Sequence, residues 1–96
     1  MLRHVILFRF YKTVAEEERV AAVSALKELG SKIPEVLDWS VGVSRHGAPS
    51  EHYDVAQVSS FASREELARY RENPEHVRIR DMFSRIADWV VVDYET

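Results

Sequence analysis

The sequence predicts a single α+β domain built from four β-strands and two or three helices. Two observations on the 96 residues indicate this class. Short runs of β-branched and aromatic residues recur four times, and segments with apolar residues at helical spacing lie between them. No repeat, linker or low-complexity segment divides the chain, so one domain is expected over residues 1–96.

The first strand is expected at residues 4–11, HVILFRFY, which are rich in β-branched and aromatic side chains. The first helix follows at about 14–29, where apolar residues recur at helical spacing. Thr13 is placed to cap its start, and glutamates fill its first turn, where the helix dipole favours negative charge. Gly30 is placed to end it.

The second and third strands are predicted at 36–44 and 53–61. In the second strand, apolar residues alternate with small polar ones, which predicts one apolar face. The polar segment between them, residues 45–52, contains glycine and proline and is typical of a loop. The two strands are therefore expected to form an antiparallel hairpin.

An Asn-Pro corner separates the second and third helices. Ser63 and Glu66 form a capping box that opens the second helix. Asn73 ends that helix and caps the next one, in which Pro74 takes the first position. The last strand is expected at 88–95.

The order βαββααβ predicts a ferredoxin-like protomer, with an antiparallel four-stranded sheet and its helices on one face. The first and last strands carry apolar residues on both faces, whereas a sheet with one wet face should alternate cleanly. Something must therefore cover the far face. With one domain and no third layer, a second copy of the chain is the simplest cover, so we expect a two-fold homodimer that packs sheet against sheet.

Composition excludes several classes of function. Thirteen basic residues are scattered among sixteen acidic ones, with a net charge of −3, and no basic stripe suggests nucleic-acid binding. The N-terminal MLRHVILFRF is too short and too charged for a signal peptide, and no apolar run approaches a membrane span. There is no cysteine, hence no disulfide framework and no thiolate nucleophile. We expect a cytoplasmic protein.

Tyr70 and His76 lie on either side of the Asn-Pro corner. His76 falls near the positive end of the third helix, which lowers a histidine pKa and favours a neutral general base. Alternatively, it is a helix-start histidine bound to a loop carbonyl. Tyr70 lies on the apolar stripe of the second helix, either as a core tyrosine or as a hydrogen-bond donor to an enolate oxygen. The helix break makes their convergence possible.

The other titratable residues are weaker candidates. His4 opens the first strand and is either a boundary residue or a donor in a pocket wall. His46 and His52 flank a loop and do not define a metal site. Asp54 and Asp93 lie near strand ends and are expected to be structural, hydrogen-bonded acids.

Four segments carry a resemblance to a known family: RHVILFRF, YDVAQVSSFASREELARY, NPEHV and VVDY. In order and spacing they resemble the stress-responsive dimeric α/β-barrel (Dabb) domains over nearly the whole chain. The resemblance implies a ferredoxin-like protomer whose sheet pairs with that of a second copy to form a dimeric α/β barrel.

The resemblance also implies an activity. One enzyme of this family is a plant polyketide cyclase that works by intramolecular aldol condensation. Its acid/base pair matches Tyr70 and His76, and a histidine that lines its pocket matches His4. Val55 stands where the cyclase has another pocket histidine, and Asn73 stands where the family often has histidine. Val55 and His4 are the expected substrate-binding residues.

Two functions follow as hypotheses. The first is a cofactor-independent enzyme, such as a cyclase, aldol-type lyase or isomerase, which transfers protons on a small carbonyl or polyketide-like substrate. The second is a non-catalytic homodimeric stress-response or ligand-binding module, in which Tyr70 and His76 only shape a cavity. Neither a metal nor a cofactor is expected, and the ligand would be a small apolar or aromatic carbonyl compound.

Overall fold

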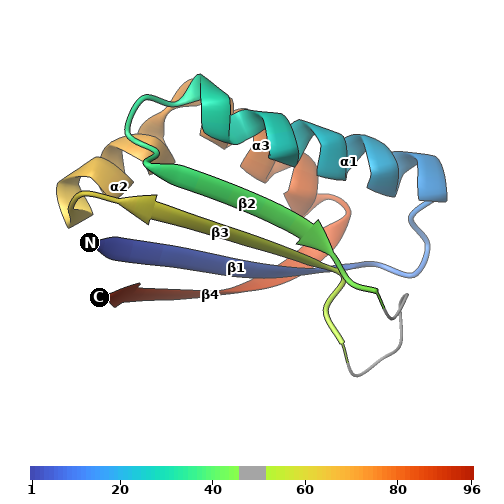
Figure 1. Cartoon of the computed structure of the whole chain (residues 1–96). Helices are drawn as coiled ribbons and strands as arrows, with labels where there is room; N and C mark the ends of the chain where they lie inside the picture. Colours follow the sequence, from blue (N-terminus) through green and yellow to red (C-terminus); the bar gives the residue numbers. More distant parts are fainter. Residues whose placement is uncertain (46–51) are drawn as a thin grey trace.

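The structure, a computed structural model, describes residues 1–45 and 52–96. Strands and helices follow one another in the expected order, with one short 3-10 helix, η1, in addition (Figure 1). The elements are β1 (Leu2–Phe10), α1 (Glu16–Leu29), η1 (Gly30–Lys32), β2 (Asp38–Val43), β3 (Val55–Phe61), α2 (Arg64–Glu72), α3 (Pro74–Ser84) and β4 (Ala87–Glu95).

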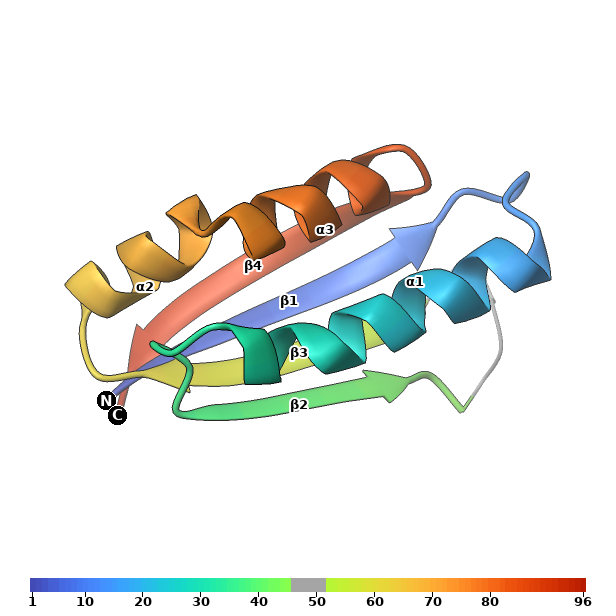
Figure 2. The same cartoon turned by 90° about the horizontal axis from the view of Figure 1, so that it is seen from above.

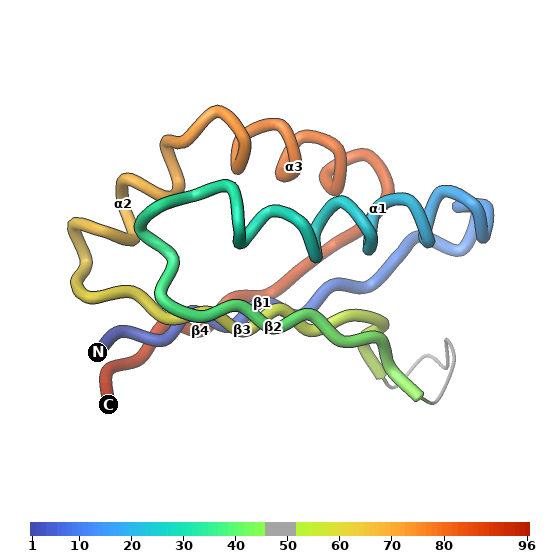
Figure 3. Tube along the Cα trace, turned by 45° about the horizontal axis from the view of Figure 1, so that its top comes forward, coloured from blue at the N-terminus to red at the C-terminus, as the bar shows by residue number. Residues whose placement is uncertain are grey.

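The sheet has four strands in the order β2-β3-β1-β4, and all neighbouring pairs are antiparallel. All helices cover one face of it, with α1 toward β2 and α3 toward β4 (Figure 2). In Figure 3 the helices of the described residues all lie on the same side of the sheet. The predicted ferredoxin-like architecture is therefore confirmed.

The register of β1 with its two neighbours fixes which side chains face the helices. His4 lies opposite Ser59 of β3 and Asp93 of β4. Residues directly opposite one another in paired strands point to the same face of the sheet. These three residues therefore form a row across its helix-facing side. Figure 1 shows the start of β1 at the end of the sheet where α2 lies, and His4 is the third residue of β1.

The core fills the space between this face and the helices. Phe8 of β1 packs against Phe83 of α3 with 4.5 Å between ring centroids. Apolar residues of α1 complete the core from the other side, as the helical spacing predicted. They are Ala22, Val23, Leu26 and Leu29.

The far face of the sheet is apolar over the middle of β1 and β4, as the sequence predicted for these two strands. Val5 and Leu7 of β1 are half-buried there. Three residues of β4 on the same face are exposed: Val90 at 47%, Val92 at 59% and Tyr94 at 45%.

The start of α1 differs from the prediction. Its N-cap is Ala15, whose side chain makes no capping hydrogen bond, and not Thr13. Thr13 instead lies in a turn, next to a backbone hydrogen bond from Val14 N to Tyr11 O of 3.2 Å. The chain uses these residues to reverse direction after β1, so the helix begins two residues later than a cap at Thr13 would place it.

Gly30 ends α1 as predicted, but for a packing reason. Its φ of −58° is ordinary helical geometry that any residue adopts. A Cβ atom at this position would lie 2.2 Å from Cγ of Trp39. The indole of Trp39 is fixed there because its Nε1 donates a hydrogen bond to the carbonyl of Leu26 at 3.0 Å.

The Asn-Pro corner forms as predicted. Of the predicted capping box at the start of α2, one half forms: Ser63 Oγ accepts a hydrogen bond from Glu66 N at 3.3 Å, but the carboxylate of Glu66 binds Arg69. Asn73 Oδ1 accepts from Glu75 N at 2.9 Å and caps α3, with Pro74 at the first helical position. The extended ψ of 131° at Asn73 separates the two helices.

Candidate functional site

A cavity of about 230 Å³ lies between the helix-facing side of the sheet and the helices. Its walls are largely apolar, and its polar lining groups are two histidines, a tyrosine and two arginines. The histidines and the tyrosine are His4, Tyr70 and His76. The structure thus brings three of the four sequence-predicted site residues to one place.

Tyr70 is supplied by the last turns of α2 and is 1% exposed. Its ring lies 4.4 Å from that of His76 and 6.0 Å from that of His4, between centroids. Burial raises the pKa of the Tyr70 phenol far above its usual value of 10.0, so the hydroxyl keeps its proton. Within the described residues the hydroxyl forms no hydrogen bond.

His76 is supplied by the first turn of α3. Its Nδ1 lies 3.0 Å from the carbonyl oxygen of Arg71. A carbonyl only accepts hydrogen bonds, so Nδ1 carries the proton and Nε2 of the neutral ring keeps its lone pair. Burial lowers the pKa of His76, and the positive charges of Arg80 and Arg71 lower it further. The neutral imidazole that the sequence predicted is therefore favoured, chiefly by burial.

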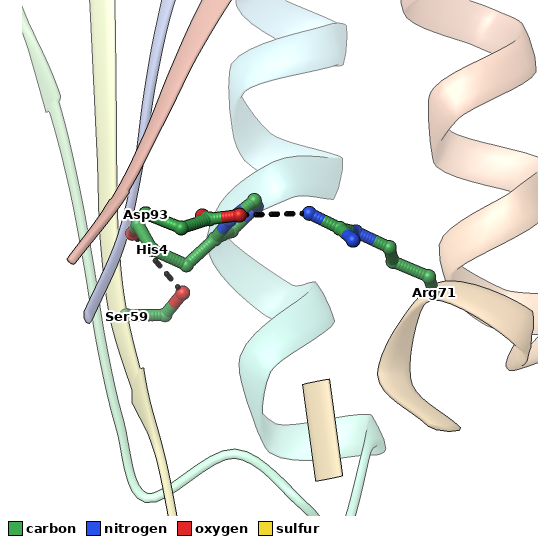
Figure 4. A network of polar contacts seen from close by, with 4 residues as sticks. All are labelled: His4, Ser59, Arg71 and Asp93. Atoms are coloured by element: carbon green, nitrogen blue, oxygen red, sulfur yellow. Dashed lines mark hydrogen bonds and ion pairs between the residues drawn. The ribbon is translucent and has the colours of Figure 1, made fainter. Parts of the chain in front are cut away.

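His4 belongs to a polar network that joins the sheet to α2 (Figure 4). The ring is 3% exposed, and its Nδ1 lies 2.5 Å from Oδ1 of Asp93. The other carboxylate oxygen of Asp93 accepts from Arg71 Nη2 at 2.9 Å. Ser59 Oγ lies 3.4 Å from the His4 carbonyl, to which it donates.

This network leaves His4 neutral with a free Nε2. Burial lowers the pKa of His4, and this effect exceeds the rise caused by the hydrogen bond and the charge of Asp93. Because a carboxylate only accepts, Nδ1 of His4 carries its proton. Sequence reasoning treated Asp93 as a structural acid and did not single out Arg71. The antiparallel pairing of the first and last strands was the signal that could have placed Asp93 opposite His4.

Val55 is not brought to this cavity. It is buried, 2% exposed, and lies opposite Phe8 of β1, two register positions beyond Ile6. Asp54 is a structural acid as expected, since its Oδ2 accepts from Phe10 N at 2.8 Å. His52 is exposed, and His46 lies outside the described residues. Over residues 1–45 and 52–96, no group of three or more histidine, aspartate or glutamate side chains could hold a metal ion.

The fold and the cavity define a ferredoxin-like α+β protein in which the buried Tyr70 and the half-buried His76 line a cavity between the sheet and the helices. Residues 2–96 match the stress responsive A/B barrel domain (Dabb), and the chain belongs to this family. The resemblance given by the sequence motifs is thereby confirmed. Among the described residues, no helix is both long and apolar enough to cross a membrane.

Similar proteins support the assignment. An uncharacterized protein of Streptomyces coelicolor is 32% identical over 97 residues, which cover 99% of each chain. A dimeric ferredoxin-like protein of unknown function from Thermobifida fusca is 26% identical, with a TM-score of 0.87 over 99% of this chain and 90% of that one. A hydroxynitrile lyase from Passiflora edulis has a TM-score of 0.83 over 97% of this chain and 90% of that one. Its identity is 18%, which shows the shared fold alone.

Proposed function

We propose that this protein is a cofactor-independent enzyme that transfers a proton on a small carbonyl compound, as a cyclase, an aldol-type lyase or an isomerase. One observation carries the proposal. The Tyr70 and His76 rings lie 4.4 Å apart on the wall of one apolar cavity, where His4 also lies. Each histidine has its Nδ1 bound to a fixed oxygen, which leaves both Nε2 atoms to act on a ligand.

His76 is the general base in this reaction. Its Nε2 takes a proton from the carbon next to the substrate carbonyl; the C–H bond breaks, an N–H bond forms, and the electron pair moves to the carbonyl oxygen. The base must be neutral, and the lowered pKa of His76 keeps it neutral near pH 7.

Tyr70 stabilises the enolate oxygen that forms. Its raised pKa keeps the phenol protonated, so it donates a hydrogen bond to the oxyanion. The apolar walls strengthen this interaction because the effective dielectric constant is lower there than in water. In a cyclase the enolate then attacks a second carbonyl, and in an isomerase it is reprotonated at another carbon. In an aldol-type lyase, His76 instead takes the proton of a β-hydroxyl group; the C–C bond breaks, that carbon becomes a carbonyl, and the electron pair moves to the enolate oxygen held by Tyr70.

His4 orients the substrate from the sheet side of the cavity. Asp93 fixes the tautomer of His4, because the nitrogen that donates to the carboxylate must carry the proton. The Passiflora lyase shows that this fold supports carbon-centred chemistry, but the proposal rests on the cavity of this chain and not on that likeness.

Hydrogen-deuterium exchange tests this proposal without knowledge of the true substrate. Benzoylacetone and aryl methyl ketones are incubated with the protein in D2O, and loss of the signal of the protons next to the carbonyl is followed by NMR. We expect catalysed exchange, which His76→Ala reduces about a hundred-fold. His52→Ala is the matched control, because His52 is exposed and lies outside the cavity lining. Binding without catalysed exchange would favour the ligand-binding module.

We also propose that the chain forms a homodimer through the far face of its sheet. The exposed apolar residues of β4 on that face support it, as does the description of the Thermobifida protein as dimeric. Sedimentation at micromolar concentration should give the mass of two chains. Val92→Asp should shift the mass toward one chain without loss of the fold, since Val92 is 59% exposed in the protomer. A parent protein that sediments as a monomer would contradict the proposal.

A further inference from the structure

The two arginines of the cavity lining differ in how their charge is balanced. Arg71 donates a hydrogen bond to Asp93 at 2.9 Å. Arg80 lies 3.5 Å from Asp81, and both side chains are half exposed or more, at 50% and 58%. An exposed ion pair at this distance contributes little to stability. Arg80 therefore brings a guanidinium with unused donors to the edge of the cavity.

Arg80 lies on the same face of α3 as His76. The two residues are four apart, so they lie one above the other on one face of the helix. Both line the cavity. The charge of Arg80 is felt at the imidazole, because it is the largest electrostatic contribution from another side chain that lowers the pKa of His76.

The cavity limits the size of the ligand. Its volume of about 230 Å³ lies below the roughly 300–1,000 Å³ of typical ligand pockets, which favours a small ligand. A single aromatic ring with short substituents occupies a space of this order. The walls around it include Phe8, Phe83 and Trp89, which suit a flat apolar ring.

We propose that the substrate is a small monoanionic carboxylic acid, whose ring or short chain fills the cavity and whose carboxylate is held by Arg80 at the edge. The inference rests on the proposed function for the second substituent, a carbonyl group placed between Tyr70 and His76. A guanidinium matches a carboxylate with two parallel hydrogen bonds. A monoanion supplies a second counter-charge to Arg80, whose exposed pair with Asp81 at 3.5 Å is weak, whereas a dianion would add repulsion toward Asp81 and Asp93.

Two isosteric probes test the charge of the ligand. They are 4-acetylbenzoate and its neutral counterpart 4-acetylbenzamide. Affinity is measured at low ionic strength by NMR titration, in which shifts of the His4 and His76 ring protons report that a probe is in the cavity. We expect the acid to bind about tenfold more tightly, because a charge-assisted hydrogen bond at a half-exposed site gives a preference of this order.

Three variants assign the preference to one residue. Arg80→Gln should abolish it, and Arg80→Lys should keep part of it. Arg78→Gln is the matched control: it removes the same charge from the same helix, but Arg78 is bound to Glu75 at 3.2 Å and does not line the cavity. Equal affinity for the two probes would overturn the inference. Equal losses of preference in Arg80→Gln and Arg78→Gln would also overturn it, because the effect would then be one of net charge.

Exchange of the acetyl protons in the same samples separates this inference from the proposed function. Catalysed exchange that is equal for acid and amide, and unchanged in Arg80→Gln, overturns the carboxylate site and leaves the catalytic proposal standing. An Arg80-dependent preference for the acid without exchange supports the anion site and contradicts the proposed activity. If Arg80→Gln does not fold, Arg80→Lys compared with the parent decides between the same outcomes.

Discussion

Replacing Tyr70 with phenylalanine should show whether the Tyr70 hydroxyl has a catalytic role or whether the residue only packs in the core. The substitution keeps the ring and its contacts with His4, Phe61 and His76, and removes only the hydroxyl. That hydroxyl makes no hydrogen bond within the described residues, so its loss breaks none there. We therefore expect the free energy of unfolding to change by less than about 1 kcal/mol.

The same change should strongly affect catalysis. If Tyr70 donates to the oxyanion as proposed, its loss should reduce the exchange rate about a hundred- to a thousand-fold, which is the effect of deleting one oxyanion donor in a serine protease. The assays are urea-induced unfolding and the hydrogen-deuterium exchange of benzoylacetone, both run on Tyr70→Phe and on the control Tyr94→Phe. Tyr94 lies on the opposite face of the sheet and outside the cavity lining, and the change keeps its ring, so we expect little effect in either assay. A loss of stability above about 2 kcal/mol, or an unchanged exchange rate, would refute the reasoning.

Three further predictions concern the fold around the site. Gly30→Ala should destabilise the protein by about 1–3 kcal/mol, since the new Cβ would lie 2.2 Å from an indole carbon, whereas Gly42→Ala meets nothing within 4 Å and should be neutral or better in the same unfolding assay. Burial lowers the folded-state pKa of His4 and His76 below 6.5, the value in the unfolded chain. The free energy of unfolding should therefore be highest above pH 6.5 and should decrease as the pH falls from 6.5 through the folded-state pKa values of the two histidines. A double variant with glutamine at both positions should flatten this part of the pH curve; a slope that persists would assign it to other groups. Trp89→Asp should lower the free energy of unfolding by several kcal/mol, because the Trp89 ring packs against Phe8 on the helix-facing side, with 5.7 Å between ring centroids. If the variant unfolds in urea at the same midpoint as the parent, the ring contributes nothing to stability.

Local chemistry made most of the fold predictable. Strand alternation and the Asn73-Pro74 corner depend on neighbouring residues, and both appear as expected. Thr13 was a plausible cap on its own, but the reversal after β1 uses it in a turn. The need for this turn comes from how the strand and helix pack, which single-residue preferences do not contain.

The candidate site was predictable only in part, because half of it depends on contacts between distant segments. Tyr70 and His76 are close in sequence, and the corner between them pointed to their convergence. The hydrogen bonds of Asp93 to His4 and Arg71 join residues 89 and 22 positions apart. Apolar patterning carries no information on such a pair; strand register does, once the pairing of β1 with β4 is assigned.

The break between α2 and α3 brings Tyr70 and His76 together. In a continuous helix, a separation of six residues turns a side chain by about 600°, so Tyr70 and His76 would point about 120° apart. The extended backbone of Asn73 resets this phase, and the rings meet at 4.4 Å. The same break places the carbonyl of Arg71 at the end of α2, where it accepts the Nδ1 proton of His76. One local event, an Asn-Pro corner, thus sets the position of the His76 imidazole, its tautomer and its contact with Tyr70, and it also starts the helix that carries Arg80 one turn further along.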